Sequence, residues 1–169
     1  MVLFKSQNEL DMKFEDVLRK QILVLDGAMG TMVQNLELSD AAFGGKAFKM
    51  LTDLLIFSRP DDLEGIHLKY LRAGANLIET DTFGASPLRL KEFDFTQIDP
   101  TNIHAVPEGL DLKKSDYLAI TYHLNIEGCR IARKAIERYK DEPGYDGRPL
   151  FLSLIHISEP TRRTPMSYA

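Results

Sequence analysis

Several kinds of residue are scarce in this chain, and each scarcity excludes a class of structure. The 169 residues include one cysteine, Cys129, and no tryptophan. A single cysteine excludes an internal disulfide and a cysteine-rich metal site. The longest apolar runs, residues 22–25 and 54–57, fall far short of the roughly 20 residues that span a bilayer. We therefore expect no membrane partner.

Basic residues do not outnumber acidic ones. The chain has 21 Lys and Arg against 25 Asp and Glu, a formal net charge of −4. No basic patch stands out, so no nucleic-acid partner is expected. The first ten residues lack the apolar centre of a signal peptide, which makes a cytoplasmic location the default. A hydrophobic content of 44% and a charged content of 27% are typical of a globular domain.

The last residues differ in character from the rest. Residues 152–163 read LSLIHISEPTRR, which resembles an in-frame translation of a sequencing adapter. We therefore expect residues 152–169 to be a non-native tail and exclude them from the fold. Residues 1–151 are expected to be part of one domain.

Hydrophobic periodicity in residues 1–151 predicts alternating strands and helices. Pro60 suits the first turn of a helix and Gly74 its end, while Ser115 or Asp116 suits the cap of a long helix. Strands are expected over residues 22–25 and 76–80 and after Pro149, helices over 10–20, 31–36, 60–73, 86–90 and 116–140, and a loop over 94–114. The apolar stripe expected for the last helix is Leu118, Tyr122, Ile126, Cys129, Ala132 and Ile136.

This order, without hairpins or internal repeats, favours an α/β fold with a parallel sheet and crossover helices. Two architectures fit. A (β/α)8 barrel needs about 250 residues, so this chain would supply its first two or three βα units. A doubly wound sheet would be nearly complete at this length.

Two strand ends carry the candidate chemistry, because ligands gather at the carboxyl ends of parallel strands. The first reads DGAMGT over residues 26–31. A carboxylate is followed by two glycines where a helix is expected to begin, so backbone N–H groups there suit an anion. The motif is neither a dinucleotide fingerprint nor a P-loop. A tight turn that Asp26 caps is the alternative interpretation.

The second strand end reads ETDTF over residues 79–83. Strand alternation puts Glu79 and Asp81 on one face, and neighbouring parallel strands lie about 4.8 Å apart. These acids and Asp26 are therefore expected to share a pocket wall. Carboxylates beside an anion-binding turn suit a zwitterion such as a free amino acid. Alternatively, Glu79 and Asp81 pair with Arg72 or Arg89.

Together these motifs resemble the homocysteine S-methyltransferase family, and most closely the amino-terminal homocysteine-binding module of cobalamin-dependent methionine synthases. The resemblance is carried by LDGAMGTM at 25–32, FKMLTDLLIFSRP at 48–60 and YLRAGANLIETDTFGA at 70–85. It implies an incomplete (β/α)8 TIM barrel. It also implies transfer of a methyl group to the zinc-bound thiolate of homocysteine, which forms methionine.

The resemblance also implies site residues. Asp26 is the expected amino-acid contact, and Glu79, Thr82 and Phe83 are its neighbours on the second strand. The anion-binding turn is expected to be Gly27, Ala28, Met29, Gly30 and Thr31. Asp81 stands where the family usually has asparagine, so its contact with substrate is left open.

The resemblance implies zinc, cobalamin and downstream folate and cobalamin modules only for a longer protein. The family's three zinc-binding cysteines have no match up to residue 151. Cys129 lies in the middle of an expected helix, on its apolar stripe, and is expected to be buried in the hydrophobic core. His123 and Glu127 suit a solvated helix pair better than a metal site. We expect this chain alone to bind no metal or cofactor and to lack catalytic residues.

Other functions stay open. The chain is either the amino-terminal part of a methyltransferase, a non-catalytic fragment with an open sheet edge, or a small amino-acid-binding α/β protein. The last would require residues 152–169 to complete a sheet. The methyl donor is open too, since enzymes that use betaine or S-methylmethionine share this first domain.

Overall fold

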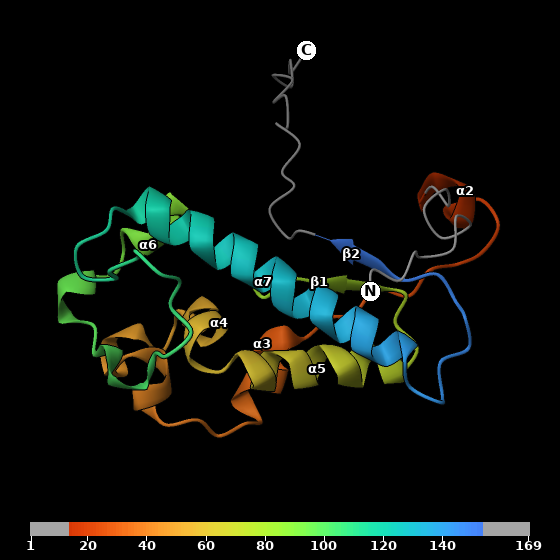
Figure 1. Ribbon diagram of the computed structural model, residues 1–169, viewed down its shortest axis with the longest axis horizontal. Helices are drawn as coiled ribbons and strands as arrows, with labels where there is room; N and C mark the ends of the chain where they lie inside the picture. Colours follow the sequence, from red (N-terminus) through yellow and green to blue (C-terminus); the bar gives the residue numbers. More distant parts are fainter. Residues whose placement is uncertain (1–13, 154–169) are drawn as a thin grey trace, which may run out of the picture.

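The computed structural model describes residues 14–153, and its long helices pack beside a small parallel sheet (Figure 1). The α-helices are α2 Phe14–Leu18, α3 Met29–Gln34, α4 Leu55–Ser58, α5 Pro60–Arg72, α6 Pro87–Leu90 and α7 Tyr117–Lys140. The strands are β1 Leu77–Glu79 and β2 Phe151–Ser153. Short 3-10 turns are η1 Asp40–Phe43, η2 Lys46–Phe48, η3 Thr52–Leu54, η4 Phe95–Gln97 and η5 Pro100–Asn102. The expected α/β alternation is confirmed at this level.

The sheet is parallel, as predicted, and β1 lies between two neighbours. On one side β1 pairs with β2, with Ile78 opposite Leu152. On the other side Leu25 forms a parallel bridge to Leu77. The side chain of Asn76 forms hydrogen bonds to the segments on both sides of β1. Its Oδ1 accepts from the Val24 N–H at 3.1 Å, and its Nδ2 donates to the Pro149 carbonyl at 3.1 Å.

The strand predicted over residues 22–25 is reduced to that one bridge. Ile22 is 92% exposed and Val24 and Leu25 are about half exposed. Within residues 14–153 this segment has β1 as a partner on one side. A segment paired along one edge has fewer hydrogen bonds and apolar contacts to make it regular than a strand inside a sheet. Strand β2 includes Leu152 and Ser153, the first residues of the expected tail.

Helices α5 and α7 form the main helical contact and run alongside each other (Figure 1). Pro60 opens α5, and Gly74 follows its end with φ 111°, as the sequence predicted. Asp116 caps α7 by accepting from the Ala119 N–H at 2.7 Å. Ser86 caps α6 by accepting from the Arg89 N–H at 3.3 Å.

The stripe predicted for α7 was wrong in its first turns. Leu118 and Tyr122 are exposed, and Ile126 and Cys129 are half-buried. The buried residues of α7 are Ile120, Leu124, Gly128, Ile131, Ala132, Ala135, Ile136 and Tyr139. Gly128 and the two alanines leave room for a close approach to neighbouring elements, so the packed face mixes small residues with large apolar ones.

Two apolar clusters make the core. The larger joins α4 and the 3-10 turns to α5, α7 and the loop over residues 94–114. The smaller lies between α5, α7 and β1. No helix within residues 14–153 combines the length and the apolar character needed to cross a membrane.

Candidate functional site

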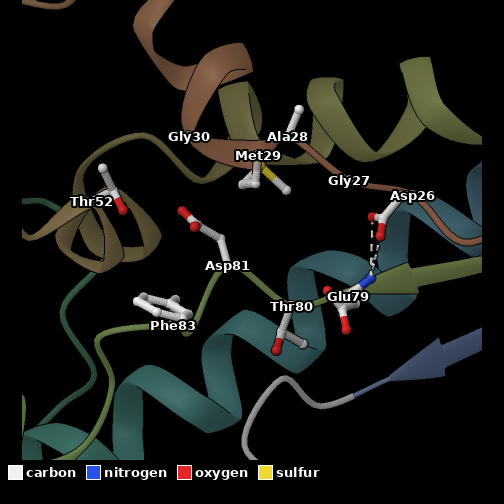
Figure 2. Close-up of a pocket in the computed structure, with 10 residues that line it drawn as sticks. All are labelled: Asp26, Gly27, Ala28, Met29, Gly30, Thr52, Glu79, Thr80, Asp81 and Phe83. Carbon is white, nitrogen blue, oxygen red and sulfur yellow. Dashed lines mark hydrogen bonds between the residues drawn. The ribbon is translucent and has the colours of Figure 1, made fainter.

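A pocket of about 280 Å³ lies where β1 ends, opposite the turn that leads into α3 (Figure 2). The residues that line it are Asp26, Gly27, Ala28, Met29, Gly30, Thr52, Glu79, Thr80, Asp81 and Phe83. Both predicted strand ends therefore contribute to one cavity. Seven of the nine residues proposed from the sequence line it, while Thr31 and Thr82 do not. Their contact with a substrate stays a prediction.

Asp26 is held by the strand beside it. Its backbone N–H donates to the Leu77 carbonyl at 2.9 Å. Its two carboxylate oxygens accept from the Glu79 N–H at 3.2 and 3.1 Å (Figure 2). The pKa of Asp26 is raised to about 6, mainly by burial. The hydrogen bond from the Glu79 N–H lowers this pKa, and the negative charge of Glu79 raises it further. The carboxylate is thus oriented before any ligand arrives and is mostly ionised at neutral pH.

The turn after Asp26 is strained at an unexpected residue. Ala28 has φ 47° and ψ 33°, the left-handed region, which costs a non-glycine residue free energy. Gly27 and Gly30 are not among the residues with positive φ. The sequence pattern located the turn but not its left-handed residue. The first N–H groups of a helix have no intrahelical partners, and Met29 and Gly30 at the start of α3 line the pocket.

Asp81 lies in the wall of the pocket beside Asp53. Asp53 is 2% exposed and accepts from the Gly84 N–H at 2.8 Å. A Cβ at position 84 would lie 2.5 Å from Asp53 Oδ2, so this approach requires glycine. Burial, and then the charge of Asp53, raise the pKa of Asp81 to about 7. Its carboxyl group is therefore partly protonated and partly ionised near neutral pH.

Thr82 and Thr31 lie outside the pocket. Thr82 is fully buried, its hydroxyl lies 2.7 Å from that of Thr80, and its methyl group faces Gly128 of α7. Thr82 therefore joins the strand end to α7. Thr31 is exposed on α3, where its carbonyl accepts from the Asn35 N–H.

The alternative in which arginines neutralise the pocket acids does not occur within residues 14–153. Arg72 binds Glu142, with Nη2 and Oε1 2.6 Å apart, and Arg89 binds Glu92. In this part of the chain, the pocket lining contains acids but no Lys, Arg or His. A positively charged group would therefore be attracted to this pocket.

The described residues do not fit the zinc site that the family resemblance implies. Among residues 14–153, no three His, Cys, Asp or Glu side chains are placed to hold a metal ion. Cys129 is half-buried on α7, outside the pocket lining, so its expected core position was wrong. Glu127 pairs with Arg130, while His123 packs its ring against Tyr122.

Thr52, which lines the pocket, and Asp53, which binds the Gly84 N–H, were not predicted from the sequence. One signal was present, because Asp53 directly precedes the apolar run over residues 54–57. An acid beside such a run must find a hydrogen-bond donor when it is buried. Its donor, the Gly84 N–H, is 31 residues away in the chain, and no local pattern could identify it.

Known proteins resemble this chain in sequence and in structure. The sequence model of the family described as homocysteine S-methyltransferase matches residues 23–158, which extends beyond residue 151 into the expected tail. Two structures of homocysteine methyltransferase MmuM from Escherichia coli, in metallated and oxidized forms, match with TM-scores of 0.57. They are 25% and 26% identical to it, and each match covers 82% of this chain. The chain spans 39% and 38% of their length.

Proposed function

Because this chain belongs to the homocysteine S-methyltransferase family, we propose that its pocket binds the amino-acid end of homocysteine. In the complete protein, a methyl group is transferred to the homocysteine sulfur to form methionine. The observation that carries the proposal is the joint lining of one pocket by Asp26, Glu79 and the turn before α3. Carboxylates on one side suit the ammonium of the substrate, and backbone N–H groups at the start of α3 on the other suit its carboxylate.

The chemistry of this chain is then substrate binding and orientation. Asp26 is the ammonium contact, because its carboxylate lines the pocket. The Glu79 N–H already holds this carboxylate in position. Glu79 adds a second negative charge, and Phe83 provides an apolar surface. Pre-organised groups lose little freedom when a ligand binds, which favours affinity.

We further propose that this chain supplies the first two or three βα units of a (β/α)8 barrel. The parallel order of the segment at Leu25, then β1, then β2 supports this architecture. So does the likeness to MmuM, of which the chain spans about two fifths. Zinc ligands then come from other parts of the barrel, and residues 1–151 alone do not catalyse methyl transfer.

The methyl donor belongs to the same proposal. Residues 25–32 and 48–60 resemble methionine synthases, which favours methylcobalamin, recharged from methyltetrahydrofolate on downstream modules. Donation from betaine or S-methylmethionine is the alternative, because such enzymes share this first domain. MmuM, named as a homocysteine methyltransferase, leaves the same choice of donors.

Asp26 provides the direct test. We expect Asp26→Asn to weaken L-homocysteine binding at least about tenfold, because a charge-assisted hydrogen bond to the ammonium contributes on the order of 1.5–3 kcal/mol. The amide oxygen of asparagine still accepts from the Glu79 N–H, so the fold is retained. Affinity is measured by calorimetry under reducing conditions at pH 7.5. Equal affinities in the two proteins would remove Asp26 from the site.

Glu108→Gln is the matched control, since Glu108 is an exposed carboxylate outside the pocket, and its affinity should equal that of the unmodified chain. A zinc titration separates the remaining alternatives. A stoichiometric, tight zinc site in this chain would contradict the placement of the metal ligands elsewhere. Homocysteine binding without zinc binding agrees with the proposal.

A further inference from the structure

Asp81 is the pocket residue that the proposed amino-acid site does not yet use. It is 7% exposed, and its Oδ2 is buried without a hydrogen-bond partner among the described residues. Figure 2 shows its carboxyl group directed into the pocket, on the side of Gly30 and Thr52, with Asp26 and Glu79 on the other side. A buried polar oxygen without a partner costs free energy, and here a ligand can supply the partner.

Among residues 14–153, the charged side chains that line the pocket with Asp81 are all acidic. The charge of Asp53, on η3, acts on Asp81 directly, and Asp26 and Glu79 line the same pocket on its other side. The turn into α3 and Thr52 contribute uncharged groups. Burial and the charge of Asp53 favour the protonated form of Asp81, so its pKa lies at about 7. A protonated carboxyl group has one O–H donor.

We infer that Asp81 acts as a neutral carboxylic acid that donates a hydrogen bond to the carboxylate of the bound amino acid. This inference rests on the proposed function. An amino-acid zwitterion offers a cation that only donates and a carboxylate that only accepts. The ammonium binds the ionised Asp26 and Glu79. The O–H of Asp81 needs an acceptor, and the carboxylate is the ionic acceptor of the substrate.

The opposite arrangement has the opposite pH dependence. If Asp81 were ionised and bound the ammonium, affinity would rise as pH increases through 7. If Asp81 is the donor, affinity falls over the same range, because deprotonation removes the O–H and places a negative charge next to the substrate carboxylate. The sign of the change therefore decides between the two roles.

The test measures the affinity of the full chain for L-methionine, which has no thiol to titrate, at pH 6.5, 7.5 and 8.5. With a pKa of about 7, the unmodified protein should lose affinity by about 25-fold from pH 6.5 to 8.5, since one proton is required. Asp81→Asn keeps an N–H donor and cannot titrate, so its affinity should change less than about threefold over that range. Glu108→Gln should follow the unmodified protein.

Two further measurements identify the partner of Asp81. The ligand 3-(methylthio)propylamine lacks the carboxylate, so its affinity should show no such loss with pH. The ¹³C shift of the Asp81 carboxyl group should titrate near pH 7 in the free protein and at higher pH with L-methionine bound. This measurement needs no variant, so it holds even where Asp81→Asn fails to fold.

The outcomes separate the two proposals. Binding with the same pH dependence in Asp81→Asn and the unmodified protein overturns the role of Asp81 and leaves the amino-acid site standing. So does an affinity that rises through pH 7, or a carboxyl titration below pH 5. Absence of binding to both L-methionine and L-homocysteine at every pH overturns the proposed function, and the role of Asp81 with it.

Discussion

Asp81 lines the pocket and Asp53 is buried beside it, and their different partners give them different roles. Asp53 accepts a backbone N–H and joins η3 to the end of β1. Asp81 has an oxygen without a partner among the described residues, which is available to a ligand. A buried carboxyl group with a raised pKa stabilises the fold less as pH rises through that pKa. The ionised form of Asp81 therefore reduces the stability of the fold most at alkaline pH.

Gly128 gives a prediction at the scale of one residue. A Cβ there would lie 2.7 Å from the Thr82 methyl group and 3.3 Å from Ile56 Cδ1. We expect Gly128→Ala to lower the free energy of unfolding by about 1–3 kcal/mol, because the added methyl group overpacks the contact between α7 and the strand end. Urea denaturation measures the change.

Gly65 is the matched control, since it is also helical, but a Cβ added there would meet no neighbouring atom of residues 14–153 within 4 Å. Gly65→Ala should raise the free energy of unfolding by up to about 1 kcal/mol through helix propensity. If both substitutions stabilise the protein equally, the close approach of α7 to Thr82 is not a constraint.

Residue patterns predicted the pocket better than its details. Acids that follow apolar strands predicted that Asp26 and Glu79 lie together, whereas Phe83 was expected only from the family resemblance; all three line the pocket. The left-handed conformation of Ala28 was not predicted, because nothing in the sequence DGAMGT assigns the positive φ to alanine rather than to glycine. The contact of the Thr82 side chain with α7 was not predicted either, since strand alternation alone does not show which helix covers which face of a strand.

At the scale of elements, Glu64 joins the two long helices. Its side chain is 4% exposed, and its oxygens lie 2.7 Å from Lys134 Nζ and 3.1 Å from Arg138 Nη1. Burial acts to raise the pKa of Glu64, but the hydrogen bonds from these two cations outweigh it, so the pKa lies below its ordinary value of 4.5. The ionised form of Glu64 therefore stabilises the contact between α5 and α7.

We expect Glu64→Gln to lower the free energy of unfolding at pH 7 by about 1–3 kcal/mol, because charge-assisted hydrogen bonds to Lys134 and Arg138 are weakened. A depressed folded-state pKa gives stability that is present above the unfolded value of 4.5 and is lost as pH falls through the folded one. The difference from the unmodified protein should thus shrink in urea titrations at pH 3.5. A difference that grows on acidification would contradict this ion-pair role.

Elements with end signals were predictable, and elements that depend on distant partners were not. The bounds of α5 follow from Pro60 and Gly74, and the start of α7 follows from Asp116. The face of α7 could not be read from apolar residues alone, because Gly128 and two alanines form part of the packed side. The 3-10 turns between α3 and α4 have no period that a sequence pattern detects.

At the scale of the whole molecule, the apolar segment before Asp26 has one edge without a strand partner among residues 14–153. Ile22 is 92% exposed and Val24 is 52% exposed, next to backbone groups that have a strand partner on one side. Such an edge pairs readily with another chain. We therefore expect this chain to self-associate, and Ile22→Lys with Val24→Lys to lower its weight-average mass in sedimentation experiments.

Leu118→Lys is the control for that prediction, because Leu118 is 68% exposed on α7, outside the sheet. Its sedimentation should match that of the unmodified chain. If Leu118→Lys reduces association and the paired substitution does not, the contact between copies is made by helices rather than by the sheet edge.

The position of β1 between its two neighbours also has a consequence for the order of folding during synthesis. Ile78 pairs with Leu152, 74 residues further along the chain. At about 5–20 residues per second, a ribosome needs roughly 4–15 s to make that segment. Over that interval the segment at Leu25 is the one strand neighbour that residues 14–151 give β1, so its other edge is open to chaperones and to other nascent chains.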